Sequence, residues 1–279
     1  MSIFQLLLPA FVASLILTGI HAYLGVHVVE RGVIFVDLSL AQIAALGTTV
    51  AYLAGYDLHS TGAYVFSLGF TFLGAAIFAF SRTHHHQTRI PQEAVIGIVY
   101  AVSASVAILV MSKATQETEH LKEMLVGNIL SVTWVELGRT AILYALVGVF
   151  HYVFRERFLL ISMNEAEAER RGWNIRFWDF LFYISFGFVV TSSVAIAGVL
   201  LVFCFLIVPS VAAMLYSEKL GTRLAIGWSV GALVSAGGVA LSFFLDLPTG
   251  ATIVATFGAM LILLAAARRL FRRPAAAAG

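Results

Sequence analysis

The sequence predicts an all-α fold, a polytopic integral membrane helix bundle with about nine spans. Two observations carry this prediction: 60% of the 279 residues are hydrophobic against 11% that are charged, and the apolar residues lie in long blocks. A helix of about 20 apolar residues rises roughly 30 Å, the thickness of the hydrocarbon core of a bilayer. A soluble domain needs a charged surface that this chain lacks. We therefore expect a multi-pass protein of the cell (inner or plasma) membrane.

The apolar segments follow one another along the whole chain. They fall near residues 4–29, 33–55, 61–80, 93–112, 135–154, 179–196, 198–216, 224–244 and 249–267. The stretch from Phe180 to Ser217 is 38 residues without a charge, too long for one crossing. It predicts two short spans that turn near residues 191–193 or at Gly198. If segments are re-entrant instead, the count falls to eight or seven. Residues 1–273 then form one transmembrane domain, and residues 274–279 a short cytoplasmic tail.

Lysine and arginine placement predicts the orientation, because cytoplasmic loops are enriched in these residues. With the N-terminus outside and the C-terminus in the cytoplasm, 14 of the 17 basic residues fall inside. Only Lys113 and Lys122 then face out, against six acidic residues, which leaves the outer loops with a net charge of −4. Such a negative mouth attracts cations. The alternative is that these residues are ordinary solvated loop charges.

A short polar stretch, "MNEAEAERRGWN" at residues 163–174, interrupts the apolar pattern. It has the order of a capped helix, with an N-cap, an acidic first turn, a basic last turn and a glycine C-cap. These are Asn164, Glu165, Glu167, Arg170, Arg171 and Gly172. The orientation puts the stretch in the longest interior loop, residues 155–178. The sequence therefore predicts a short polar helix on the cytoplasmic face.

This stretch resembles the coupling helix of ABC importer permeases, in which an Ala and a Gly four residues later seat in a groove of the ATPase subunit. Ala168 and Gly172 occupy those places. Other segments resemble the ABC-3 family, the branch that imports zinc, manganese or iron. They are "RGVIFVDLSLAQIAALGTTVA" from Arg31, "QEAVIGIVYAVSASVAILV" from Gln92, "LVGNILSVTWVEL" from Leu125 and "AGVLLVFCFLIVPSVAAMLYSE" from Ala197. The match runs in order over nearly the whole chain.

The resemblance implies a type II ABC importer-like permease domain over residues 1–273, in a subunit that acts as a homodimer in the lipid bilayer. Its implied partners are a cytoplasmic ATP-binding subunit and an extracytoplasmic metal-binding protein, with no nucleic acid. The chain has no Gly-x-x-x-x-Gly-Lys-Ser/Thr phosphate loop, so ATP hydrolysis is expected on the separate subunit. We expect no enzyme activity and no bound cofactor here, and a divalent metal as cargo, zinc slightly ahead of manganese or iron. The ATPase-coupling residues are expected to be Asn164, Glu165, Glu167, Ala168, Arg171 and Gly172.

Polar residues within a span are costly and are usually functional. Asp37 is the acidic residue that lies well inside a predicted crossing, and Ser39 and Gln42 share its helix. We interpret these three as translocation-pathway candidates, with Asp37 and Gln42 as transient metal contacts. Many family members carry an Asp and a His four residues apart here, where this chain has Leu38 and Gln42. Asp37 lies one residue early, so it either lines the pathway or pairs with Arg31.

Histidines and loop acids are further candidates for metal contacts. His84, His85 and His86 form an interior loop that either binds the metal as it exits or is simply solvated. Outside, Glu119, His120 and Glu123 either guide metal at the entrance or pair with a docking protein. His21 and His27 in the first span are expected to bond neighbouring helices.

Small residues and one proline predict how the spans pack. Gly227, Gly231, Ser235 and Gly238 recur every three or four positions, which favours close helix contacts in lipid. Pro209 removes a backbone hydrogen bond and is expected to act as a helix hinge.

Two other transport classes fit less of the sequence. Permeases for siderophores, haem or cobalamin share the coupling-helix logic, but those chains are longer. An ATP-independent secondary metal transporter is expected to carry several charged residues at mid-membrane, whereas only Asp37 qualifies here.

Overall fold

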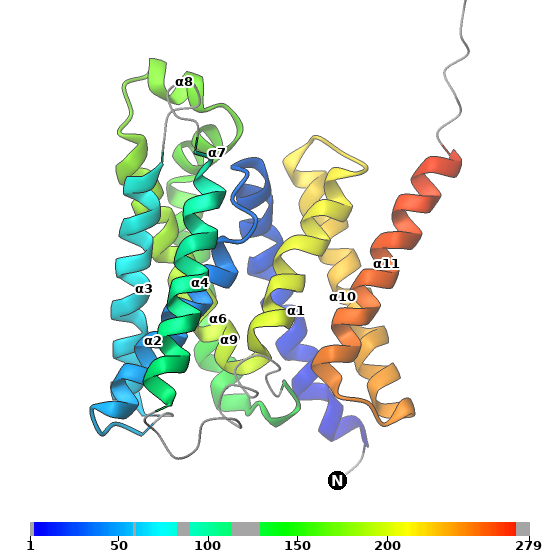
Figure 1. Ribbon diagram of the computed structural model, residues 1–279. Coiled ribbons are helices and arrows are strands. Elements are labelled where there is room, and N and C mark those ends of the chain that lie inside the picture. The colour runs from blue at the N-terminus through cyan, green and yellow to red at the C-terminus, as the bar shows by residue number, and fades with distance from the viewer. Residues whose placement is uncertain (1–2, 58–59, 83–89, 113–128, 272–279) are drawn as a thin grey trace, which may run out of the picture.

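The computed structural model describes residues 3–57, 60–82, 90–112 and 129–271 of the chain (Figure 1). These residues form helices joined by short turns, with no strand among them. The helices are α1 (Ile3–Glu30), α2 (Val36–Leu53), α3 (Thr61–Ser81), α4 (Gln92–Met111), η1 (Ile129–Ser131), α6 (Trp134–Val153), α7 (Arg155–Met163), α8 (Glu165–Arg170), α9 (Ile175–Met214), α10 (Leu220–Leu245) and α11 (Thr249–Phe271). The predicted all-α membrane bundle is confirmed.

Seven helices of the described ranges are long and apolar enough to cross a membrane. They are α1, α2, α3, α4, α9, α10 and α11. An eighth candidate is the pair α6 and α7, whose axes are bent by 76° at the junction. Phe154, between the two helices, has a non-helical backbone. It separates the apolar helix α6 from the charged first turn of α7. The chain therefore turns sharply just before the predicted interior loop.

Helix α9 is divided at Gly198, one of the two predicted turning points. Gly198 has φ 74° and ψ 164°, a backbone conformation that favours glycine. At 40 residues α9 would be about 60 Å long if it were straight, twice the thickness of a bilayer core. Instead both of its ends lie at the end of the bundle that carries α8 (Figure 1), so the chain reverses at Gly198. Pro209, the expected hinge, lies in the second half, where the backbone stays helical.

The bundle core forms where α9 packs against α1, α2, α3, α10 and α11. Close approach of these helices depends on glycine. A Cβ at Gly25 of α1 would lie 2.0 Å from the Leu206 carbonyl oxygen, and one at Gly231 of α10 would lie 2.2 Å from the Thr18 methyl carbon. One at Gly238 would lie 2.8 Å from Ile253 of α11. The small-residue pattern of α10 therefore marks two helix contacts, as expected.

Several sequence predictions fall outside the described residues. These are His84, His85, His86, Glu119, His120, Glu123 and the tail at 274–279.

Candidate functional site

The short helix α8 is formed by caps that the sequence indicated. The Asn164 Oδ1 accepts a hydrogen bond from the Glu167 N–H at 3.1 Å, which satisfies one of the free donors of the first turn. At the other end Gly172 has φ 69°. The Gly172 N–H donates to the Glu169 carbonyl at 2.9 Å, and the Trp173 N–H donates to the Ala168 carbonyl at 3.2 Å. This pair of bonds is a Schellman motif, so both ends of the six-residue helix α8 are capped.

The outer surface of α8 carries a set of exposed ion pairs. Glu167 pairs with Arg170 at 2.7 Å and with Arg171 at 3.1 Å, and Arg171 also reaches Glu156 of α7 at 2.8 Å. The hydrogen bond from Arg171, helped by the charge of Arg170, lowers the pKa of Glu167. The hydrogen bond to Glu167 raises the pKa of Arg171. Glu167 and Arg171 are therefore charged at neutral pH and lie on the exposed side of α8.

Ala168 lies on the inner side of α8. Its exposed fraction is 0%, and it packs with the hydrophobic core of the chain itself. Its methyl group therefore attaches α8 to the bundle and is not presented to a partner in this structure. Gly172 is exposed, and a Cβ there would meet no atom within 4 Å, so that position does face outward.

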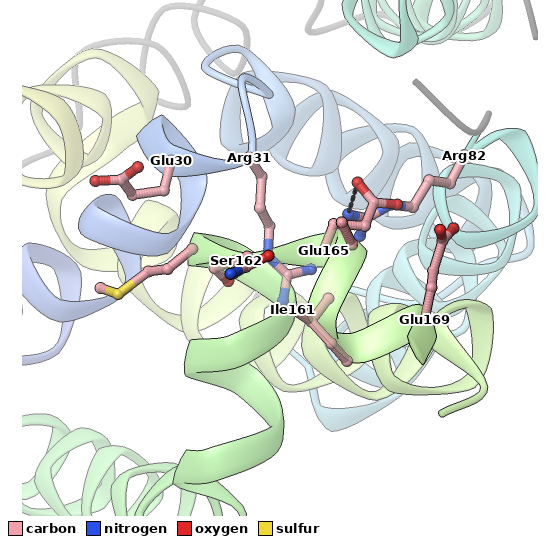
Figure 2. Close-up of a pocket in the computed structure, with 10 residues that line it drawn as sticks. Glu30, Arg31, Arg82, Ile161, Ser162, Glu165 and Glu169 are labelled. Carbon is pink, nitrogen blue, oxygen red and sulfur yellow. Dashed lines mark hydrogen bonds and ion pairs between the residues drawn. The ribbon is translucent and has the colours of Figure 1, made fainter. Parts of the chain in front are cut away.

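The inner side of α8 is tied to the bundle by a partly buried ion pair between Glu165 and Arg82 (Figure 2). Arg82, just after α3, contacts both carboxylate oxygens of Glu165, with Nε to Oε1 at 3.2 Å and Nη2 to Oε2 at 3.0 Å. Arg82 Nη1 also pairs with Oδ2 of Asp179, near the start of α9. Burial works to lower the pKa of Arg82, but the charges of Asp179 and Glu165 outweigh it and raise that pKa.

Asp179 is a buried acidic residue that sequence reasoning missed. It marked only the start of a predicted span, yet its exposed fraction is 0%. The Arg31 Nη1 donates to its Oδ1 at 2.6 Å. The predicted alternative pairing of Arg31 with Asp37 is therefore wrong, because Asp179 holds that guanidinium. Arg31 also donates from Nε to the Ser162 Oγ at 2.7 Å and lies 4.1 Å over the ring of Phe182.

A cavity of about 450 Å³ lies between the end of α1 and the α7–α8 junction. Figure 2 shows Glu30, Arg31, Ser162 and Glu165 around it, with Arg82 and Glu169 on the α8 side. Glu30 pairs with Arg223 at the start of α10. The ends of α1, α3, α7, α8, α9 and α10 thus meet at one charged region.

The pathway candidates of α2 are deeply buried. Asp37 is 1% exposed and Ser39 0%, whereas Gln42 is half-buried. Within the described ranges, the Asp37 Oδ1 and the Ser39 Oγ have no hydrogen-bond partner. Glu93, in the first turn of α4, accepts from the Phe35 N–H at 2.9 Å through Oε1, while its buried Oε2 is also without a partner there. Two helix starts therefore place carboxylates with unsatisfied oxygens across the α2–α4 contact.

The described residues contain no cluster of three or more His, Cys, Asp or Glu side chains that could hold a metal ion. His21 instead bonds the Leu17 carbonyl at 2.8 Å and the Ser193 Oγ at 3.2 Å. His27 bonds the Ser162 Oγ at 2.8 Å. Both histidines are therefore bonded to neighbouring helices, as expected.

Comparison with known proteins identifies the family. The profile of the ABC 3 transport family matches residues 3–268. The chain belongs to the ABC 3 transport family. This confirms the resemblance found in the sequence, and makes the bundle a multi-span membrane component of that family.

Relatives of this ABC 3 chain include two bacterial membrane proteins. It is 25% identical over 250 residues to the manganese transport system membrane protein MntC of Listeria innocua, covering 88% of this chain and 84% of the relative. It is 28% identical over 251 residues to a probable iron transport system membrane protein of Haemophilus influenzae, covering 90% and 89%.

Solved structures confirm the fold of the family member. PsaBC from Streptococcus pneumoniae in complex with Fab matches with a TM-score of 0.75 at 22% identity, over 94% of this chain and 91% of the other. An inward-facing conformation of a putative metal-chelate type ABC transporter matches with a TM-score of 0.71 at 20% identity, over 93% and 85%.

Proposed function

We propose that the chain is the permease subunit of an ATP-driven importer for divalent transition-metal ions. The observation that carries this proposal is the construction of α8. Its outer surface presents charged side chains, and its inner side is ion-paired through Glu165 to Arg82 at the end of α3, which in turn pairs with Asp179 of α9. A partner that pushes on α8 therefore pushes on the spans. Membership of the ABC 3 family and the names of the relatives support the same function.

The proposed topology has nine spans. Six helices cross once each, the two halves of α9 give two more crossings, and the bent α6–α7 pair gives one. The N-terminus lies outside, and α8 lies in the cytoplasm with the C-terminus. Arg31, Arg82, Arg155, Arg171 and Arg223 lie at the α8 end, as an enrichment of basic residues on the cytoplasmic side requires. Residues 1–273 are one permease domain, and two copies enclose a pathway on their two-fold axis.

The work of transport is mechanical for this chain. ATP is bound and hydrolysed on a cytoplasmic partner subunit, and closure of two such subunits displaces the two copies of α8. The displacement tilts the spans that gate the pathway. An extracytoplasmic binding protein delivers the metal at the opposite end. No covalent step is assigned to any residue described above.

The inner end of the pathway is proposed to pass Asp37 and Glu93. Buried carboxylate oxygens without a donor are expensive in a membrane unless a cation or proton satisfies them. Both residues lie in the first turn of their helices, and the Phe35–Glu93 hydrogen bond holds those turns together. Carboxylate oxygens are ligands that Mn²⁺ prefers, whereas Zn²⁺ is more often bound by imidazole or thiolate. The relatives are named for manganese and iron transport. We therefore place manganese or iron ahead of zinc as cargo.

The direct test is metal uptake by the assembled complex. The permease, its ATPase and its binding protein are reconstituted in liposomes, and uptake of Mn²⁺, Fe²⁺ and Zn²⁺ is measured in parallel with and without ATP. ATP-dependent uptake of one or more of these ions is the expected result. Uptake by the permease alone down a gradient would instead indicate a secondary transporter.

The contact with the ATPase is tested by Gly172→Val. Gly172 has a positive φ, which a β-branched residue adopts only with strain of roughly 1–2 kcal/mol. We expect less ATPase to co-purify with this variant. Gly55→Val is the matched control, because Gly55 also has a positive φ and open space around it. Equal loss of the ATPase in both variants would contradict the assignment of α8.

A further inference from the structure

Asp179 joins three helix ends to α8 through two arginines. Its carboxylate is fully buried, with Oδ1 held by Arg31 from the end of α1 and Oδ2 held by Arg82 from the end of α3. Arg82 also contacts Glu165, at the start of α8, through its Nε and Nη2 atoms. The order of contact is therefore Glu165, Arg82, Asp179 and Arg31. We call these four residues the Asp179 chain.

The Asp179 chain resists deformation because of its geometry and burial. The guanidinium of Arg82 is a planar fork that holds two carboxylates in fixed directions, so sliding of α8 against α3 breaks bonds on both sides. The side chains of Arg31 and Asp179 are 2% and 0% exposed, so salt and water screen this pair little. Pulling Asp179 away from Arg31 would leave the buried guanidinium of Arg31 without a counter-charge.

The other ion pairs of α8 are of a different kind. Arg171 and Glu156 join α8 to α7, but these side chains are 44% and 72% exposed. Exposed pairs are screened and hold their partners weakly. Helix α7 is the element that packs most closely on α8, and it is also its neighbour in the chain. The Asp179 chain is thus an ionic route from α8 to spans that are distant in sequence, partly exposed at Glu165 and buried at Asp179 and Arg31.

We propose that Asp179 is a positioning residue for transport, which turns displacement of α8 into movement of α3 and α1. Arg82 carries the displacement from Glu165 to Asp179, and Arg31 passes it to the end of α1. The ends of α1, α3 and α9 then move with α8 as one body. This inference rests on the proposed function, because it needs a partner that displaces α8.

The test measures metal ions transported per ATP hydrolysed in the reconstituted complex. Glu165→Gln removes the charge that attaches α8 to Arg82 but leaves the buried pairs in place. Arg82→Lys keeps the positive charge but lacks the planar guanidinium fork that holds Asp179 and Glu165 in fixed directions. We expect both variants to hydrolyse ATP and to transport at least about fivefold less metal per ATP, the lower end of typical coupling between sites. Glu218→Gln, at the same end of the bundle, removes an exposed acidic charge outside the Asp179 chain and is expected to keep the wild-type ratio.

The outcomes separate the two proposals. If the wild-type complex imports no metal, the proposed function fails. If wild type imports metal and Glu165→Gln and Arg82→Lys keep its ratio, the inference is overturned. Loss of the ATPase from the purified variants would assign these residues to docking and would also overturn it. Asp179→Asn is expected to lower the metal transported per ATP further, because it weakens the contacts to both arginines. If this variant does not fold, the Glu165→Gln and Arg82→Lys results still test the inference.

Discussion

Asp179 shows what a single residue's position in the sequence conceals. In the sequence it stands at the beginning of an apolar run and looks like an interfacial residue. Its two partners, Arg31 and Arg82, precede it by 148 and 97 positions. No local pattern connects positions so far apart, whereas the bundle brings three helix ends together at one point. The same packing leaves Asp37, which the sequence did single out, without the arginine that one interpretation gave it.

Asp37 carries a prediction about transport. Asp37→Asn replaces a buried carboxyl group, whose Oδ1 has no partner among the described residues, by an amide that cannot act as an anionic metal ligand. We expect metal uptake to fall by about tenfold or more, the scale seen when a metal site loses a supporting group. The measurement is ATP-driven uptake with the ATPase rate recorded alongside. Glu218→Gln, at an exposed position at the α8 end of the bundle, is the control. Unchanged uptake in Asp37→Asn would remove this residue from the pathway.

Gly25 carries a prediction about stability. A Cβ there would lie 2.0 Å from the Leu206 carbonyl oxygen and 2.3 Å from the Ser210 Oγ. Overpacking of this kind costs about 1–3 kcal/mol, more than the roughly 0.5–1 kcal/mol that alanine gains over glycine in a helix. Gly25→Ala is therefore expected to lower the melting temperature of the purified protein.

The control for Gly25 lies in the same helix. Gly19 of α1 has no atom within 4 Å of its would-be Cβ, so Gly19→Ala is expected to leave the melting temperature unchanged or to raise it. The two variants are compared by thermal unfolding in detergent. A Gly25→Ala protein as stable as Gly19→Ala would show that α1 and α9 pack less closely than described.

At the scale of elements, α8 was predictable because the residues that start and end this helix are close together in the sequence. The N-cap, the acidic first turn and the C′ glycine lie within nine residues, and each works through its immediate neighbours. The burial of Ala168 was not predictable, because it depends on which face of α8 meets the bundle. Helix α9 shows the same division: the sequence indicated a turn and offered Gly198 as one site, but only the fold selected it.

The ion pairs of α8 predict a dependence on pH. The pKa of Glu167 is lowered from its ordinary value of 4.5 by the Arg171 hydrogen bond and the Arg170 charge. A lowered pKa means that the stabilisation is fully present above pH 4.5 and is lost as the pH falls through the folded-state value. We expect the amides of α8 to lose protection from hydrogen exchange in that acidic range.

A variant separates this effect from general acid unfolding. Glu167→Gln lacks the titrating group, so its α8 amides should show a lower and pH-independent protection relative to the rest of the chain. Mass spectrometry of hydrogen exchange at several pH values, corrected for intrinsic rates, makes the comparison. The same acid-induced loss in wild type and Glu167→Gln would show that another group controls α8.

At the scale of the whole molecule, the arrangement of the two ends follows from charge. Buried and exposed ion pairs gather at the α8 end, where α1, α3, α9 and α10 end or begin. The opposite end carries Asp246 at the turn between α10 and α11. The proposed topology places the first end in the cytoplasm and the second outside.

Cysteine labelling tests this topology. In a Cys204→Ala background, which removes the single native thiol, Arg170→Cys and Asp246→Cys place a thiol at an exposed position at each end. A membrane-impermeant maleimide added to intact cells should label the Asp246→Cys protein and not the Arg170→Cys protein. Labelling of Arg170→Cys from outside would invert the topology and remove α8 from the reach of a cytoplasmic ATPase.

Composition and local order in the sequence determined that this chain crosses a membrane many times and carries a capped polar helix between two apolar segments. Those properties depend on how residues interact with water, lipid and near neighbours, which a linear pattern records. Tertiary structure alone decided that α9 reverses at Gly198, that Ala168 faces inward, and that Asp179 joins Arg31 to Arg82. These outcomes depend on contacts between distant segments, because only packing determines which buried charge meets which partner.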